Sequence, residues 1–271
     1  MKPDAKTKVI HQNEGGYVLM DGRADTKQGV GQSTPDPWAE SSDQKFALGT
    51  LLRNGDRAWR YCKNGAVALV VGAPVQQAAA VHAEQDDDIA VGAAAAIGAT
   101  SVEVTSTANL DGSPNNVAND FAEGYLIVND EAGEGHIYKI KSNELLDTTA
   151  DSTFTLYPDE SIRVALTTSS QVGLVRNPFY KVIATTAVVS GMVVGVPQFA
   201  VTEDYYFWCQ TGGPASVIPQ AAIALGTYAV VGTTAAKANT SAAATTELYL
   251  GDPMTPGVAD TEAMIVFLRY D

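Results

Sequence analysis

Three consecutive aspartates, Asp86, Asp87 and Asp88, form the densest group of potential ligand atoms in the sequence. Carboxylate oxygens are the ligands that Ca²⁺ prefers, so a calcium site is one interpretation of this group. The EF-hand calcium loop, however, places its acidic ligands at alternate positions rather than at adjacent ones. We therefore expect a solvated linker here and keep the calcium site as the alternative.

Histidine and cysteine are scattered along the chain rather than spaced as metal ligands or catalytic partners. The three histidines lie in different segments, and Cys62 and Cys209 are far apart in the sequence. Two cysteines are also too few for a disulfide scaffold. The sequence contains no phosphate-binding loop and no GxSxG nucleophile elbow. We therefore expect no catalytic residue, no metal site and no cofactor, and we interpret the chain as a non-enzyme.

Basic side chains are concentrated in one short segment of the sequence. Arg53, Arg57, Arg60 and Lys63 lie within it, and Asp56 is the only acidic residue among them. Complementary charge steers the docking of protein partners. We predict that these four side chains face a protein partner.

Two aromatic residues stand out in the polar N-terminal region, which is rich in Gly, Asp, Ser and Pro. Tyr17 belongs to a short apolar cluster, and Trp38 follows Pro35 and Pro37, which hold the backbone extended. Trp and Tyr are enriched in the cores of protein interfaces. Both residues are therefore candidates for partner binding, although Trp38 could instead pack on its own domain.

Residues 205–208 form a run of four aromatic side chains, YYFW. On a strand, Tyr205 and Phe207 would face one side, and Tyr206 and Trp208 the other. Core packing explains one face, and the other face could be a sugar-stacking platform or a subunit contact. The following residues, QTGGP, predict a turn that ends the strand.

The net charge of −14 comes from one part of the chain. Residues 83–160 hold 16 acidic side chains against only Lys139 and Lys141. Nucleic-acid binding requires lysines and arginines that displace counterions from phosphates, so we expect no nucleic-acid partner. No run of about 18 apolar residues exists, and the N-terminus lacks the apolar stretch of a secretory signal, so we expect no membrane partner.

Short segments of alternating polar and apolar residues dominate the sequence beyond residue 46. The candidate strands recur at roughly the 8–12-residue spacing of sandwiches and barrels. Residues 161–167, SIRVALT, show the clearest alternation, and turn residues at 54–56, 64–65 and 130–135 predict hairpins. The alanine-rich residues 90–99 are interrupted by two glycines, which argues against a long helix. We predict an all-β protein with a sandwich or barrel-like body.

Changes in composition divide the chain into three parts. Residues 1–45 are polar and turn-rich and predict an extended N-terminal arm, because they could not bury enough surface alone to offset their ordering entropy. Residues 46–82 predict a small β-rich segment, and residues 83–271 predict the main β domain.

Several blocks between residues 46 and 235 are similar, in order, to a group of tailed-phage virion proteins. They include FALGTLLRNGDRAWRYCKNGAVALVVGAPV, FAEGYLIVNDEAGEGHIYKIKSN and VVGVPQFAVTEDYYFWCQTGGPASV. The resemblance implies a capsid decoration (cement) protein, made in the host cytoplasm, that binds the major capsid protein on the outer capsid surface. It also implies a homo-oligomer, a trimer or a dimer. The alternative is a receptor-binding fibre or spike, or a tail structural protein, with carbohydrate affinity.

Overall fold

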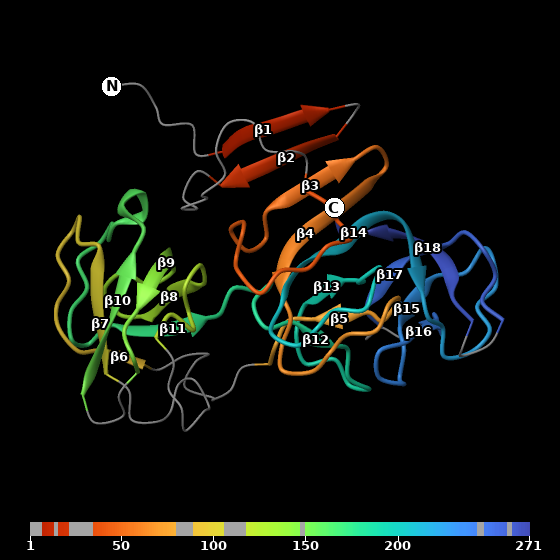
Figure 1. Ribbon diagram of the computed structural model, residues 1–271. Coiled ribbons are helices and arrows are strands. Elements are labelled where there is room, and N and C mark those ends of the chain that lie inside the picture. Colours follow the sequence, from red (N-terminus) through yellow and green to blue (C-terminus); the bar gives the residue numbers. More distant parts are fainter. Residues whose placement is uncertain are drawn as a thin grey trace. The chain divides into compact units, whose positions relative to one another are not determined.

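The computed structural model describes residues 7–13, 16–21, 35–79, 89–105, 118–146, 150–242, 247–258 and 262–271, with backbone only for 7–21. Its regular structure consists of strands and one short 3₁₀ turn, Pro158–Glu160 (Figure 1). The prediction of an all-β protein is confirmed.

The chain forms two compact units that differ from the three parts expected from composition. Unit 1 combines Met1–Ala78 with Pro178–Asp271, and unit 2 is Ala79–Asn177. Residues 46–82 are therefore not a separate segment, and residues 83–271 are not one domain. The reason is strand pairing between distant parts of the sequence: β4 (Arg57–Lys63) pairs with β14 (Tyr206–Val217). Composition along the chain carries no signal for such pairing.

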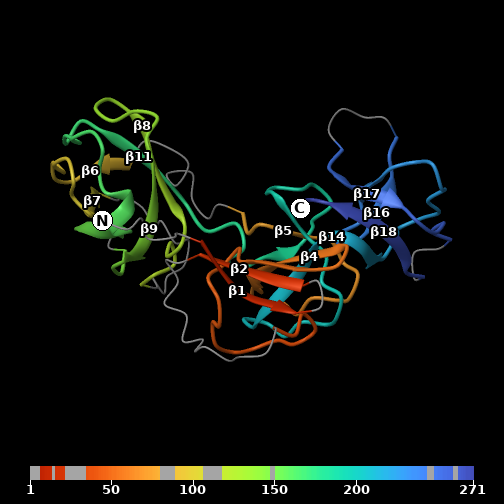
Figure 2. The same ribbon diagram turned by 90° about the horizontal axis from the view of Figure 1, so that it is seen from above.

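A nine-stranded sheet is the main element of unit 1, in the order β1-β2-β3-β4-β14-β18-β17-β15-β16. In Figure 2, β1 and β2, at one end of this order, lie apart from β16, β17 and β18, which lie toward the other end. The strand bounds are β1 Thr7–Asn13, β2 Gly16–Asp21, β3 Leu51–Asn54, β4 Arg57–Lys63, β14 Tyr206–Val217, β15 Ala229–Val231, β16 Ala238–Thr240, β17 Tyr249–Pro253 and β18 Met264–Arg269.

The N-terminal region is only partly the extended arm that the sequence predicts. Strands β1 and β2 pair as an antiparallel hairpin, and β2 continues the sheet by pairing with β3. Further along, the backbone of Ser41 pairs with that of Tyr206, at N–O distances of 2.8 and 2.9 Å. The described parts of this region are therefore ordered by main-chain hydrogen bonds to unit 1, which offset the ordering entropy.

Unit 1 also contains a small sheet that covers one face of the long one. Its order is β12-β5-β13, with β5 Val75–Gln76, β12 Ile183–Ala184 and β13 Val193–Gly195. Val75 and Val194 pack in one buried cluster with Cys62, Phe207 and Cys209 of the long sheet. This packing buries both cysteines as free thiols.

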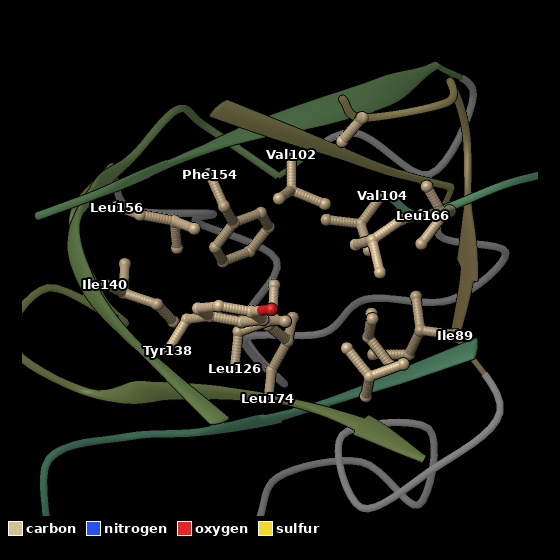
Figure 3. Packing of buried hydrophobic residues seen from close by; sticks show 14 of the residues in the cluster. Ile89, Val102, Val104, Leu126, Tyr138, Ile140, Phe154, Leu156, Leu166 and Leu174 are labelled. Carbon is tan, nitrogen blue, oxygen red and sulfur yellow. The ribbon is translucent and has the colours of Figure 1, made fainter. Parts of the chain in front are cut away.

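Unit 2 is a closed six-stranded barrel in the order β10-β7-β6-β11-β8-β9. Alternation along its strands sends one set of side chains inward, where they form a single apolar core (Figure 3). Phe154, Leu126 and Ile140 are fully buried there. The bounds are β6 Ile89–Val91, β7 Ser101–Thr105, β8 Tyr125–Asp130, β9 Ile137–Asn143, β10 Asp151–Leu156 and β11 Gln171–Val175.

The hairpin predictions had mixed outcomes. The turn at residues 54–56 joins β3 to β4, and the turn at 130–135 joins β8 to β9. The prediction for residues 64–65 is wrong, because Asn64 is buried and its side-chain amide binds the carbonyls of Val67 and Thr202. Residues 90–99 form no helix, as expected.

Two strand predictions were wrong for reasons of tertiary structure. Residues 161–167 form no named strand, although Ile162 and Leu166 are buried in the barrel core. Conversely, β14 does not end at the glycines but continues to Val217. The register of β14 on β4 shifts between Gln210 and Gly212, and pairing with β4 ends at Gly212. Pro214 therefore pairs with β18 alone, where its missing N–H leaves no broken pair with β4.

Candidate functional site

The four basic residues of the 53–63 segment do not form one patch. In the β3–β4 hairpin, Arg53 pairs directly with Ala58, which places it on the same face of the sheet as Arg60. Arg57 and Lys63 have the opposite parity on β4 and lie on the other face. The sequence cluster is therefore split into two pairs on opposite faces of the sheet.

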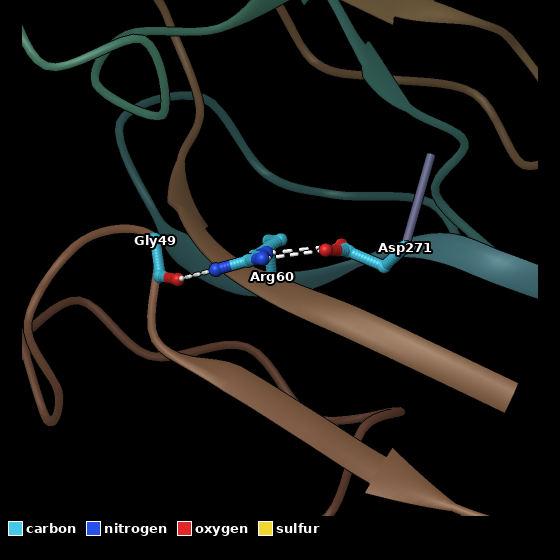
Figure 4. A network of polar contacts seen from close by, with 3 residues as sticks. All are labelled: Gly49, Arg60 and Asp271. Atoms are coloured by element: carbon cyan, nitrogen blue, oxygen red, sulfur yellow. Dashed lines mark hydrogen bonds and ion pairs between the residues drawn. The ribbon is translucent and has the colours of Figure 1, made fainter. Parts of the chain in front are cut away.

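Arg60 is committed to contacts within unit 1. Its Nε donates to Oδ2 of Asp271 at 2.9 Å, and its Nη1 donates to the carbonyl of Gly49 at 2.8 Å (Figure 4). Burial raises the pKa of the Asp271 carboxyl, but the Arg60 hydrogen bond and the charges of Arg60 and Arg53 outweigh it and leave the pKa lowered. Arg60 therefore links Asp271, which follows β18, to the β3–β4 hairpin instead of projecting toward a partner.

Lys63 is also held within unit 1. Its Nζ lies 5.4 and 5.6 Å from the ring centroids of Tyr180 and Tyr206, and 3.9 Å from Oδ1 of Asp204. Its side chain is only 18% exposed. These cation–π contacts leave little of the ammonium group for an external partner.

Arg53 and Arg57 are the basic side chains of this segment that remain for a partner. Both are partly exposed, and neither forms an ion pair or hydrogen bond through its side chain with the residues that the structure describes. The backbone of Arg53 also pairs with Tyr17 of β2, so that two of the predicted partner-binding residues share one register position. The structure describes the backbone of Tyr17 but not its side chain.

Trp38 lies on the surface of unit 1 with 47% of its area exposed. Its backbone N–H donates to Oδ1 of Asp36 at 2.9 Å, which helps to fix the turn from Asp36 to Ala39. The rest of its area is covered, in keeping with packing on the surface of its own domain, but Trp38 joins none of the buried clusters of the described residues. Trp38 therefore remains a candidate for partner binding.

The aromatic run on β14 is a core element on both faces of the sheet. Phe207 is fully buried on one face, and Trp208 is 3% exposed on the other. Trp208 packs against Phe46 and Tyr61 with ring centroids 5.1 and 5.0 Å away, and burial raises the pKa of Tyr61 to about 12. The Trp208 ring is thus enclosed by protein and offers no stacking platform for a sugar.

An exposed apolar segment of unit 1 is residues 66–71, AVALVV, which we call the 66–71 segment. Val67, Val70 and Val71 are 75%, 57% and 41% exposed, whereas Leu69 between them is buried in the core. Leu69 and Val201 exchange backbone hydrogen bonds of 2.9 and 3.0 Å, which hold the segment in place. The sequence analysis missed this surface. Its signal was a run of uncharged apolar residues with no polar residues alternating among them.

Charge is distributed unequally between the two units. Unit 2 holds 16 acidic and 4 basic side chains, a net of −12, whereas unit 1 holds 15 acidic and 13 basic ones, a net of −2. The acidic excess seen in the sequence therefore belongs to unit 2. Unit 1 is nearly neutral and carries the 66–71 segment, Trp38 and the two available arginines.

Metal ligands do not converge in the part of the chain that the structure describes, since no group of three His, Cys, Asp or Glu side chains is placed to hold an ion there. Asp86, Asp87 and Asp88, the candidate calcium ligands, lie outside the described residues. Among the described residues, no helix is long and apolar enough to cross a membrane.

Comparison with known proteins found no matching family model, no matching curated protein and no matching solved structure.

Proposed function

We propose that this chain is a structural protein of a tailed-phage virion that binds the shell of major capsid protein through unit 1 and stabilises it. Two observations carry the proposal: the segregation of charge between two separately cored units, and the exposed valines of the 66–71 segment in the nearly neutral unit. A nearly neutral unit with an exposed valine-rich segment suits docking, because apolar surface contributes most of the free energy of association. The resemblance of several sequence blocks, in order, to tailed-phage virion proteins is consistent with the same assignment.

The acidic unit 2 suits the side of the molecule that faces solvent. Burying its excess of 12 negative charges against a partner would require as many compensating cations or a large desolvation penalty. A strongly charged outer unit also keeps neighbouring copies soluble and apart. In this proposal unit 1 binds the shell, unit 2 projects from it, and copies of the chain repeat with the symmetry of the shell.

The test is co-sedimentation of the purified protein with capsid shells that lack it. The variant Val67→Asp with Val70→Asp places two charges in the 66–71 segment, and we expect it to lose most of its binding. The control variant Val188→Asp with Val258→Asp adds the same charge at two other exposed valines of unit 1, which are 83% and 68% exposed. Equal loss in both variants, or loss in neither, would contradict docking through the 66–71 segment.

A further inference from the structure

Two exposed tyrosines, at β15 and β17 of the unit 1 sheet, form an aromatic pair. Tyr228 precedes β15 and Tyr249 begins β17, and they are 59% and 37% exposed. Their ring centroids are 5.6 Å apart, at an interplanar angle of 81°. Among the side chains that the structure describes, these are the two most exposed tyrosines. Neither ring therefore contributes its full area to the core.

A polar network fixes the second ring. The Oη of Tyr249 donates to Oδ1 of Asp252 at 2.7 Å, and the Nε of Arg269 donates to Oδ2 of the same carboxylate at 2.5 Å. The hydroxyl of Tyr270 donates to the backbone carbonyl of Tyr249 at 2.8 Å. The ring, the carboxylate and the guanidinium are thus held in one arrangement before any ligand binds, which lowers the ordering entropy of binding.

Arg269 retains hydrogen-bonding capacity toward solvent. Its side chain is 60% exposed, and its guanidinium lies 5.7 Å from the ring centroid of Phe267 on the same strand. A guanidinium has five N–H donors. The contacts to Asp252 come from Nε and Nη2 only, so the remaining donors are left for water or a ligand.

We propose that Tyr228, Tyr249, Asp252 and Arg269 form a binding site for a neutral hexose unit of a glycan. A pyranose ring has an apolar C–H face that packs on an aromatic ring, and hydroxyl groups at its rim that pair with carboxylate and guanidinium groups. The carboxylate and the guanidinium cancel each other's charge, so the site has no net attraction for a phosphate or an acidic sugar. This binding activity is independent of docking to a capsid shell.

The first experiment exposes the full-length protein to an array of neutral, sialylated and sulfated oligosaccharides. We expect signals from neutral hexose-containing glycans. Binding to acidic glycans alone, or to no glycan, would overturn the proposal. The neutral oligosaccharide with the strongest signal then serves as the probe in titration calorimetry.

Variants locate the site. Tyr228→Ala removes an exposed ring and should weaken the probe about tenfold or more, while Arg269→Met should weaken it by a similar factor. Tyr249→Phe keeps the ring but removes its hydroxyl, and we expect a loss of only a few fold. Tyr125→Ala, which removes a partly exposed ring from the barrel, is the matched control and should bind as the wild type does. Unchanged binding by Tyr228→Ala, or equal loss in Tyr125→Ala, would refute this location.

Discussion

Arg60 and Asp271 form an ion pair between residues separated by 211 positions in the sequence. The pair joins β4 to the segment after β18, although the strand between them in the sheet is β14. Its side chains are 31% and 13% exposed, so solvent screens the interaction only in part. This contact explains why a residue that the sequence assigns to partner binding acts within the fold instead.

Removal of Arg60, the partner of Asp271, should destabilise unit 1. We expect Arg60→Met to lower the free energy of unfolding by about 1–3 kcal/mol, because it leaves a half-buried carboxylate without its main hydrogen-bond donor. Arg57→Met, on the same strand, removes a guanidinium that has no ion pair with the described residues and should change stability by less than about 0.5 kcal/mol. Urea unfolding monitored by tryptophan fluorescence compares the two, and equal effects would argue against the role given to the ion pair.

The same pair predicts a pH dependence. The folded pKa of Asp271 is lowered from its usual value of 3.8, so the stability it contributes is fully present above that value and is lost as the pH falls through the folded pKa. The difference in unfolding free energy between wild type and Asp271→Asn should therefore be constant above about pH 5 and shrink below about pH 4. A difference that grows on acidification would contradict the lowered pKa.

Gly213 shows why β14 can continue through a sequence that predicts a turn. Its φ of +78° lies in the left-handed region, and a Cβ there would collide with the backbone carbonyl of Asp56. We expect Gly213→Ala to destabilise unit 1 by more than about 2 kcal/mol, from backbone strain and collision together.

Gly226 provides the control for this prediction. It has a similar φ of +80°, but a Cβ there would meet no atom within 4 Å. Gly226→Ala should therefore lose only the strain term, about 1–2 kcal/mol. Thermal unfolding of both variants separates the two contributions, and a Gly226→Ala variant as unstable as Gly213→Ala would leave the collision without effect.

The barrel core should respond separately from unit 1. Phe154 is fully buried at its centre, with the ring of Phe121 5.9 Å away. Phe154→Ala should destabilise the barrel by about 3–5 kcal/mol. Hydrogen exchange with mass spectrometry on the full chain should show lost protection in β7–β11 and unchanged protection in β14 and β18. Uniform loss across both units would mean that they unfold as one.

The local patterns of the sequence predicted the barrel strands best. Val102 and Val104 alternate with polar residues, and both point into the core of a barrel whose other face meets solvent. The alternation of Ile162, Val164 and Leu166 misled, because two of these residues fill the barrel core from a segment that forms no named strand, while Val164 is 39% exposed. Periodicity identified the buried Ile162 and Leu166, but it did not show that backbone pairing at Leu166 is limited to an isolated bridge with Ala95.

The candidate site depends on pairings that the sequence does not encode locally. Arg57 and Arg60 face opposite sides because of their parity along one strand, which the sequence alone shows. The position of Arg53 on the face of Arg60 follows from the register of β3 on β4, and the pairing of Arg60 with Asp271 follows from the position of the last residues of the chain. Tyr228 and Tyr249 come together only because Val230 of β15 pairs with Tyr249 of β17. Such contacts between distant segments require the three-dimensional structure.

The central proposal is that unit 1 binds a capsid shell while the acidic unit 2 faces solvent. Cryo-electron microscopy of intact particles tests it most directly. We predict density for this chain on the outside of the shell, with the 66–71 segment against the major capsid protein and the barrel projecting outward. Density for the chain in the tail or a fibre, its absence from the particle, or a barrel pressed against the shell would contradict the account.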